Sequence, residues 1–329
     1  MFSGCSQYYK GPKSHNFDGT HFYGPEYRKN NNFWEFLKWQ FSGKSIPWPK
    51  KVEVKHYAIP DSQVNGGTIK ITNVGHVTFL IQTQGVNILT DPVWSNRASP
   101  FSFIGPKRII DPGVKFENLP KIDVVWISHN HYDHLDLRTI DKLWKKFKPR
   151  IITPLGNDTI IKSYNKDIKV EAYDWYDKVS ITQDVTLHLS PMHHWSARGF
   201  FDRNKALWSA LTIETSAGNI YFVGDSGYGN GRYFKNDYKK FGPYRVALLP
   251  MGAHEPRWFM KHSHMNPEEF ILAHIDLNRP LTIPSHYDVF KLTDEARGDA
   301  LIKLAEAKKK HSINNNIKIL EVGASLLIP

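Results

Sequence analysis

Residues 128–136 read Ser-His-Asn-His-Tyr-Asp-His-Leu-Asp, and this stretch decides the fold. It follows Val-Val-Trp-Ile at residues 124–127, a short apolar run that is typical of a buried β-strand. In the extended backbone just beyond such a strand, alternate side chains point to the same side. His129 and His131 can therefore bind one metal ion.

The second half of the stretch supplies further metal ligands. After a turn, Asp133 and His134 can reach a second position close to the first. Imidazole nitrogens and carboxylate oxygens suit zinc, and they also bind iron and manganese. Two metal ions in one site can produce hydroxide from bound water at neutral pH. The alternative is a polar loop with surface histidines, and the spacing of the motif at the end of an apolar run favours the metal site.

The composition of the 329-residue chain indicates a folded protein with a basic surface. Hydrophobic residues make up 40% and aromatic residues 13%, which supplies a sizeable core and excludes an intrinsically disordered chain. The net charge of +11 favours anionic partners such as membrane lipids, nucleic acids or phosphorylated substrates. No run of about 18 apolar residues is present, so no transmembrane helix is predicted.

Cys5 is the single cysteine, which excludes a disulfide framework and a cysteine-based zinc site. The stretch Phe2-Ser3-Gly4-Cys5 resembles the end of a bacterial lipoprotein cleavage site, but the basic and apolar segments that precede such a site are missing. A free thiol is therefore the favoured interpretation. The expected location is a bacterial cytoplasm or the membrane periphery, and a start codon upstream of Met1 would instead favour a periplasmic lipoprotein.

Two regions are predicted, an N-terminal arm over residues 1–55 and one folded domain over residues 56–329. Residues 31–42 of the arm have the apolar spacing of a short amphipathic helix. The arm could lie on a membrane surface or pack over the domain, and packing is favoured because an amphipathic pattern alone rarely identifies a membrane helix. Its aromatic and basic residues are Phe22, Tyr23, Phe33, Trp34, Trp39, Trp48, Arg28, Lys29, Lys38, Lys50 and Lys51.

From about residue 66 onward, short predicted strands alternate with helices. Strands are predicted at 68–73, 77–83, 87–90, 123–127, 151–153, 185–190, 207–214, 219–223, 246–250, 281–284 and near 317–322. Helices are predicted at 136–147, 157–164, 267–277 and 293–310. The helix at 267 has clear start signals in Asn266 and Pro267. Strands with interspersed helices predict sheets covered by helices, the α/β (α+β) class.

Further ligand-type residues follow other apolar runs. His193 and His194 are adjacent, and spacing alone does not choose between them. Asp225 lies between glycines and could bridge two cations or close a turn onto its own backbone. His286 stands alone after a strand, where a histidine is more often structural. Asp91 could accept a hydrogen bond from a ligand histidine or serve as a turn residue before a proline.

Taken in order, these residues resemble the metallo-β-lactamase superfamily. A narrower resemblance is to the N-acylphosphatidylethanolamine-hydrolysing phospholipases D and their bacterial relatives, over roughly residues 60–290. The motifs that carry it are Gly75-His76, Leu89–Val93, Ser99-Pro100, Gly105–Arg108, Ile127–Asp136, His194-Trp195, Leu207-Trp208, Gly224–Tyr228, Phe241–Pro243, Gly252–Lys261, His264 and Asn266–Glu269.

The resemblance implies a four-layer αββα sandwich that binds two zinc ions per chain at one sheet edge. It selects His194 over His193, because the family's ligand directly precedes a tryptophan. The implied ligands are His129, His131 and His194 for one zinc, Asp133, His134 and His286 for the other, and Asp225 as the bridge.

The resemblance further implies a zinc-dependent phosphodiesterase that acts on a phospholipid of the N-acylphosphatidylethanolamine type. Asp133 and Asp225 would hold the hydroxide and the metals, and Tyr132 and His264 would lie beside the substrate. His264 precedes a predicted helix start, where an anion is favoured, so it could hold the phosphodiester or assist the leaving group. Arg257 could bind phosphate or form a structural ion pair. His76 could lie near the metals, but a hydrogen-bonded core position is favoured for it.

Three alternatives compete with this hypothesis. Hydrolysis of a carbon ester or lactone by the same two metals is the main one, since one fold hosts many chemistries. The charge also tolerates a nuclease, but no separate basic binding module is present, so no nucleic-acid partner is expected. A non-catalytic binding protein would have lost ligands, and all seven candidates are present. A homodimer is compatible with the sequence, which leaves the oligomeric state open.

Overall fold

The computed structural model describes residues 7–24, 33–41 and 45–329. The predictions made for Cys5, Arg28 and Lys29 lie outside the described residues. Among the described residues, no helix is long and apolar enough to cross a membrane.

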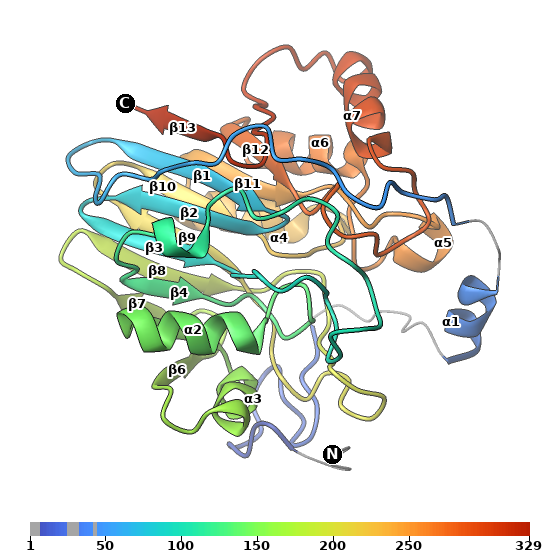
Figure 1. The fold of residues 1–329 in the computed structure, drawn as a ribbon, viewed down its shortest axis with the longest axis horizontal. Coiled ribbons are helices and arrows are strands. Elements are labelled where there is room, and N and C mark those ends of the chain that lie inside the picture. The colour runs from blue at the N-terminus through green and yellow to red at the C-terminus, as the bar shows by residue number, and fades with distance from the viewer. Residues whose placement is uncertain (1–6, 25–32, 42–44) are drawn as a thin grey trace.

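Two β-sheets stacked face to face form the centre of the molecule (Figure 1). The first sheet has seven strands in the order β13 (Ser325–Ile328), β1 (Ile69–Gly75), β2 (Thr78–Thr83), β3 (Val86–Thr90), β4 (Val124–Trp126), β5 (Arg150–Pro154) and β6 (Val170–Tyr173). The second has six strands in the order β12 (Leu281–Ser285), β11 (Tyr244–Pro250), β10 (Asn219–Phe222), β9 (Ala210–Thr215), β8 (Val185–Ser190) and β7 (Lys178–Ser180).

The direction of the strands places their ligand-bearing ends at one edge. Strands β3, β4 and β5 are parallel, and so are β10, β11 and β12. Strand β9 is antiparallel to both β8 and β10, so β8 and β10 run in the same direction. The loops that follow β3, β4, β8, β10 and β12 therefore leave from carboxyl ends at the same edge, where sites on such sheets are usually built.

The main core lies between the two sheets, because alternate residues of each strand point inward. Phe79, Trp126, Leu211 and Phe222 belong to this buried cluster, which draws residues from both sheets. The intervening residues, such as Leu80 of β2, face the helical layer on the outside. Burial of both faces accounts for the near-continuous apolar runs in these strands.

Helices cover both outer faces, which completes the four-layer α/β (α+β) sandwich that the sequence predicted. Helices α2 (Leu137–Phe147) and α3 (Asn157–Tyr164) pack on the first sheet. Helices α4 (Arg232–Phe241), α6 (Pro267–Asp276) and α7 (Asp299–Lys310) pack on the second. Three shorter elements are α1 (Phe33–Gln40), the 3₁₀ helix η1 (Phe116–Asn118) and α5 (Arg257–Met260).

Two predicted elements were wrong. The last strand is β13, which pairs with β1, whereas Ile317 forms only an isolated bridge with Thr282. The predicted helix at 293–310 begins only at Asp299. The residues before it are held as a loop, because the Glu295 carboxylate accepts hydrogen bonds from Thr293 Oγ1 and from backbone N–H groups of residues 254 and 255. Strands β6 and β7 and helices α4 and α5 were not predicted.

The described parts of the arm pack against the sandwich. Phe17 and Phe22 are fully buried in the cluster beneath α4 and α6. In α1, the Trp39 ring stacks on Phe259 with centroids 5.0 Å apart, and its Nε1 donates to Asp294 Oδ2 at 3.0 Å. Trp34 of the same helix is 74% exposed. Trp39 therefore packs on the domain, as one of the two alternatives predicted, whereas Trp34 lies on the surface.

Candidate metal centre

The loop at residues 128–136 runs from β4 into α2 and is held at both ends. The Asp136 carboxylate caps α2 by accepting from the Arg138 N–H at 3.2 Å and from Thr139 Oγ1 at 2.6 Å. Arg198 Nη1 donates to the carbonyls of Asn130 and Leu135, both at 2.9 Å. These bonds satisfy buried polar groups and leave the loop little freedom to move.

The first ligand group brings together three imidazoles and one carboxylate. His131 Nδ1 lies 2.9 Å from His129 Nε2 and 3.1 Å from His194 Nε2. Asp225 Oδ2 is 3.9 Å from His129 Nε2 and 3.6 Å from His194 Nε2. One atom from each residue falls within 4.8 Å of the others, so a single cation can bind all four.

The second ligand group lies directly beside the first. Asp133 Oδ2 is 3.4 Å from His134 Nε2 and 3.1 Å from His286 Nε2. The two oxygens of Asp225 reach this group as well, with Oδ2 at 3.1 Å from His134 Nε2 and Oδ1 at 3.0 Å from His286 Nε2. Asp225 therefore stands between two adjacent cation positions, where the sequence predicted a bridging ligand.

Two of the ligand imidazoles, those of His134 and His194, are oriented by hydrogen bonds at the ring nitrogen that faces away from the ligand group. His134 Nδ1 donates to Asp91 Oδ2 at 2.8 Å, and Asp91 also accepts from the backbone N–H and the hydroxyl of Ser128. His194 Nδ1 donates to the Ser263 carbonyl at 3.0 Å. Partners of this kind direct the other ring nitrogen at the metal and increase its basicity. Asp91 thus makes the hydrogen bond that was one of the two roles predicted for it, and its part in holding a metal ligand stays a prediction.

His193 takes a different direction from its neighbour. Its backbone N–H donates to Ser226 Oγ at 3.0 Å, and its ring packs on Tyr233 of α4 with centroids 4.4 Å apart. His193 belongs to none of the ligand groups found among the described residues. The structure therefore brings His194, and not His193, to the centre.

The electrostatics of the centre favour cation binding. Burial, reinforced by neighbouring imidazoles, holds the pKa of His129 well below its usual range, and burial lowers the pKa of His131 to about 3. Burial opposes ionisation of Asp225, but the imidazoles of His286 and His134 outweigh it and hold the pKa of this carboxyl well below normal. Burial also disfavours a charged imidazole at His134 and His286, but Asp225 and Asp133 outweigh it and raise the pKa of His134 well above its usual range and that of His286 to about 9. These two imidazoles must therefore lose a proton when a metal ion binds. Buried imidazoles packed around ionised carboxylates are a donor set that fits a pair of divalent cations.

His264 lies beside the ligands and Arg257 behind it. His264 Nδ1 is 3.9 Å from Asp225 Oδ2, and its ring is 5.2 Å from that of His194. Arg257 Nη2 donates to Glu269 Oε2 at 2.7 Å, while Nη1 donates to the carbonyl of His264 at 3.0 Å. These are the contacts of a structural ion pair that positions His264, so phosphate binding by Arg257 stays a prediction.

Tyr132 also lies at the centre's edge. Its hydroxyl donates to the Arg198 carbonyl at 2.9 Å, and the Arg198 guanidinium covers its ring at 3.9 Å. Sequence reasoning did not identify Arg198, because a single arginine in a polar loop has no distinguishing pattern. It also favoured a core position for His76 over one near the metals. In the structure His76 Nε2 lies 2.9 Å from Asp133 Oδ2, and His76 is one of the buried residues that could hold a cation there. The Gly75-His76 pair at the end of β1 was the available signal.

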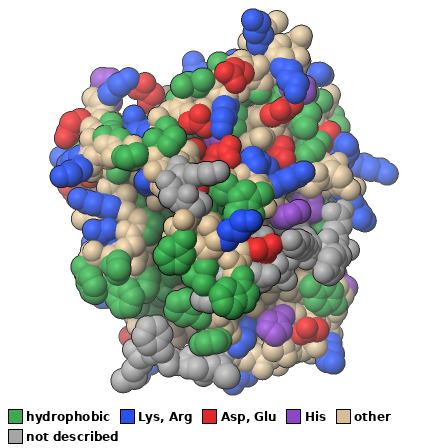
Figure 2. Space-filling view, turned by 90° about the vertical axis from the view of Figure 1, so that its right-hand side faces the viewer, with side chains coloured by type: hydrophobic (Ala, Val, Ile, Leu, Met, Phe, Trp, Pro, Cys, Tyr) green, Lys and Arg blue, Asp and Glu red, His purple; other side chains and the backbone are tan. Residues whose placement is uncertain are grey.

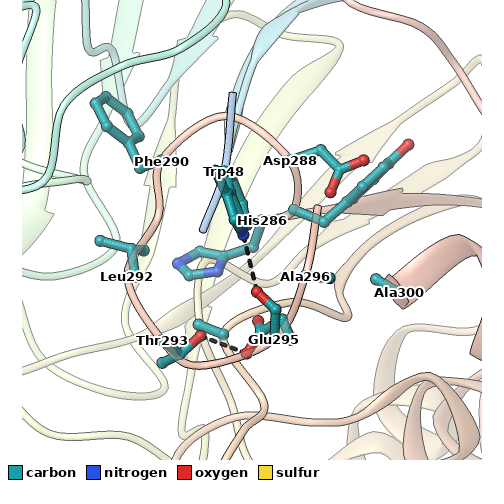
Figure 3. Close-up of a pocket in the computed structure, with 11 residues that line it drawn as sticks. Trp48, His286, Asp288, Phe290, Leu292, Thr293, Glu295, Ala296 and Ala300 are labelled. Atoms are coloured by element: carbon teal, nitrogen blue, oxygen red, sulfur yellow. Dashed lines mark hydrogen bonds between the residues drawn. The ribbon is translucent and has the colours of Figure 1, made fainter. Parts of the chain in front are cut away.

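A small cavity lies behind His286, between the end of β12 and the start of α7 (Figure 3). Trp48 Nε1 donates to the Glu295 carbonyl across this cavity, and Thr293 Oγ1 donates to the Glu295 carboxylate. The space holds only about one water molecule. It is too small for an organic substrate.

Exposed apolar residues occur in the loops beside the centre. Phe200 and Phe201, in the loop that Arg198 fastens to the metal loop, are each 82% exposed. Phe103, in the loop after β3, is 76% exposed. Figure 2 shows hydrophobic side chains gathered on one face of the molecule. Exposed apolar side chains that gather on one face commonly mark a binding region.

Comparison with known proteins agrees with this geometry. The family described as Beta-lactamase superfamily domain matches residues 86–287. The N-acyl-phosphatidylethanolamine-hydrolyzing phospholipase D 1 of Caenorhabditis elegans is 33% identical over 275 residues, which are 79% of this chain and 76% of that relative. The mitochondrial N-acyl-phosphatidylethanolamine-hydrolyzing phospholipase D of Saccharomyces cerevisiae is 33% identical over 217 residues. This match covers 64% of the chain but less than half, 46%, of the yeast protein.

Solved structures share the fold at lower identity. An isothiocyanate hydrolase from Delia radicum gut bacteria aligns with a TM-score of 0.60 and 19% identity, over 78% of this chain and 98% of that one. At this identity the likeness shows the fold alone.

Proposed function

We propose that this chain, which belongs to the metallo-β-lactamase superfamily, is a di-zinc phosphodiesterase acting on a phospholipid of the N-acylphosphatidylethanolamine type. Within the superfamily it belongs to the branch of the N-acylphosphatidylethanolamine-hydrolysing phospholipases D and their bacterial relatives, and it is a metal-dependent hydrolase. The observation that carries the proposal is the meeting of seven imidazole and carboxylate ligands from four separate loops at one sheet edge. The similarity to the nematode and yeast enzymes supports the choice of substrate class.

Each ligand has a definite part in this proposal. His129, His131 and His194 would hold one zinc, and Asp133, His134 and His286 the other, with Asp225 between them. Two zinc ions, when bound, would supply a nucleophile from water and stabilise negative charge on phosphoryl oxygens. The imidazoles of His134 and His194 are held in place by the hydrogen bonds that they donate to Asp91 Oδ2 and to the Ser263 carbonyl.

The chain's own residues must also bind the substrate and manage protons. In the proposed reaction an oxygen from water bonds to phosphorus, the bond from phosphorus to the headgroup oxygen breaks, and that oxygen takes up a proton. His264 Nδ1 is buried and has no hydrogen-bond partner among the described residues. This atom is therefore placed to hydrogen-bond a phosphoryl oxygen or the leaving-group oxygen.

The exposed loops favour a lipid over a small soluble substrate. Phe200 and Phe201 would contact acyl chains or the interfacial region of a bilayer, because aromatic side chains are stable at that depth. Trp34 of α1 is also exposed and could share this contact, whereas Trp39 is used in packing on Phe259. Peripheral membrane contact is accordingly part of the proposal.

The deciding experiment is turnover by the zinc-loaded protein of a panel of phospholipids, with the products identified. Phosphatidic acid together with an N-acylethanolamine is the expected pair of products, since it requires cleavage on the headgroup side of phosphorus. The Asp225→Asn variant is the matched control for contaminating activity. Turnover of lactones or carbon esters without any phosphodiester hydrolysis would overturn the phospholipase assignment and favour the alternative on the same metals.

A further inference from the structure

A groove lies outside the metal centre, between the first turns of α2 and the segment at residues 94–102. Its volume is about 300 Å³, which reaches the range of small-ligand sites. Trp94 and Phe101 supply aromatic walls, and three cationic residues, Arg97, Arg138 and Lys142, line the remainder together with serine, threonine and asparagine side chains. None of the described residues that line the groove is acidic.

The cations of the groove are available to an anion. Arg138 and Lys142 lie one turn apart on α2, and neither side chain forms an ion pair within the described part of the chain. The nearest carboxylate in sequence, Asp136, is engaged by the Ser95 N–H at 3.0 Å and by the cap of α2. On the outer side of the helix, Asp141 pairs with a lysine one turn further on. Asp136 keeps its negative charge beside the groove, so the three cations of the lining outnumber this one carboxylate and leave a net positive charge.

The third cation gives the groove a fixed wall. Arg97 Nε donates to the Ser102 carbonyl at 3.1 Å, and Nη1 donates to the Gly105 carbonyl at 2.6 Å. Phe101 and Phe103 pack on each other with ring centroids 5.6 Å apart. A single guanidinium thus holds the loop from 99 to 105 in shape while its charge remains at the groove.

This loop carries apolar side chains that point into solvent beside the cations. Phe103 and Ile104 are 76% and 57% exposed, and Phe101 is 43% exposed at the groove itself. Cations next to exposed aromatic and aliphatic groups match the two layers of a membrane surface, with phosphates above and acyl chains below. A nucleic acid would match the cations but would leave an exposed isoleucine unexplained.

We propose that this groove binds the phosphate of an anionic phospholipid headgroup, with Phe103 and Ile104 entering the adjacent acyl region. The bound lipid is a second lipid, distinct from the substrate at the metals, and the proposal does not rest on the reaction inferred above. Arg138 and Lys142 would contact phosphate oxygens, and Phe101 would cover the glycerol. The Ser95 to Asp136 hydrogen bond joins the groove to the loop that carries the metal ligands.

The test is co-sedimentation of the full-length protein with vesicles of phosphatidylcholine that contain or lack phosphatidylglycerol. Arg138→Glu combined with Lys142→Glu should lower partitioning onto the anionic vesicles roughly tenfold or more. The matched control is Lys166→Glu with Lys169→Glu, an identical charge change in the exposed loop between α3 and β6. It should change partitioning less than about twofold, because it leaves the groove intact.

Three outcomes would overturn the proposal. Equal loss in both double variants would show a general charge effect without a site. Unchanged vesicle binding in the groove variant, with loss of inorganic phosphate binding by titration calorimetry, would assign the groove to a soluble phosphate. Unchanged vesicle binding with loss of binding to a single-stranded oligonucleotide would assign it to nucleic acid. Because none of these measurements uses turnover, their results stand whether or not the phospholipase assignment holds.

Discussion

The metal centre and the loops around it are built in opposite ways. In the centre, His129, His134 and Asp225 are at most 1% exposed, and their polar atoms are fixed by neighbours from several strands. In the loops, Phe200 and Phe201 are 82% exposed and contribute nothing to the core. The buried centre limits which chemistry the sandwich can perform, and we expect the exposed loops to select the substrate that reaches it.

The largest effect should come from Asp225, which stands between the two ligand groups. Asp225→Asn should lower kcat by on the order of 10³-fold or more, about 4 kcal/mol of barrier, because a neutral amide cannot bridge two cations. Metal analysis should show loss of bound zinc in parallel. Asp61→Asn, an exposed aspartate paired with Lys70, is the control and should match the wild type. Full metal content and activity in Asp225→Asn would contradict the assignment of the centre.

A smaller effect is expected for Asp91, which touches no substrate. Asp91→Asn should weaken metal retention by about 10–100-fold, because its NH2 group would replace one of the two accepting oxygens. That group would face either the Ser128 backbone N–H or the donors His134 Nδ1 and Ser128 Oγ. Competition with a chelator measures this directly. Asp123→Asn, before β4 and hydrogen-bonded to the backbone of β3, is the matched control. If both variants retain metal equally, the hydrogen bond between His134 and Asp91 is unimportant for metal binding.

The exposed loop should affect lipid turnover without affecting the chemistry. Phe200→Ser combined with Phe201→Ser should raise KM for substrate in vesicles roughly tenfold, or about 1.4 kcal/mol, and leave kcat unchanged. Activity on a short-chain, soluble phosphodiester should stay at the wild-type level. Ile302→Ser with Tyr164→Ser removes comparable exposed apolar groups from α7 and α3 and should change neither constant. A fall in kcat on the soluble substrate would show that the loop shapes the centre itself.

The last effect concerns stability and not activity, at a buried carboxylate away from the metal ligands. Asp237 of α4 accepts hydrogen bonds from the hydroxyls of Ser190 and Tyr221, and burial raises its pKa to about 6. Because the folded state binds this proton more tightly than the unfolded state, the contribution of Asp237 to stability is lost as the pH rises from about 4 to about 6. The loss should amount to about 1–3 kcal/mol.

Urea unfolding of the wild type and Asp237→Asn across this pH range measures the contribution. The difference between the two free energies of unfolding should shift in favour of the variant as the pH rises, while contributions from the metal centre cancel because both proteins share it. Parallel curves would show that Asp237 does not titrate in this window. Asp133 and Asp225, equally buried but surrounded by imidazoles, have lowered pKa values, so burial alone does not account for the electrostatics of the centre.

Most of the strands, and sheets covered by helices, could be predicted from local patterns, whereas the four-layer sandwich was implied by the family resemblance. Apolar runs such as residues 185–190 coincide with strand β8, and the cap at Asn266 coincides with the start of α6. The errors arose where tertiary contacts override local preference. Residues 293–298 have no helical conformation because the Glu295 carboxylate binds the backbone of a distant loop. Strand β13 forms because it pairs with the edge of β1, about 250 residues earlier in the chain. No local pattern predicts that pairing.

By itself, the sequence determined the type of chemistry, because His129, His131, Asp133 and His134 lie within six positions and need only a strand and a turn to converge. The tertiary structure decided the rest. His194, Asp225 and His286 reach the same point only because β8, β10 and β12 run in the same direction and end at one edge. Whether His193 or His194 faces the ligands depends on the packing of His193 against α4, a contact between segments about 40 residues apart. Hydrogen bonds and burial between distant segments leave no periodic trace in a sequence, so only the folded chain shows them.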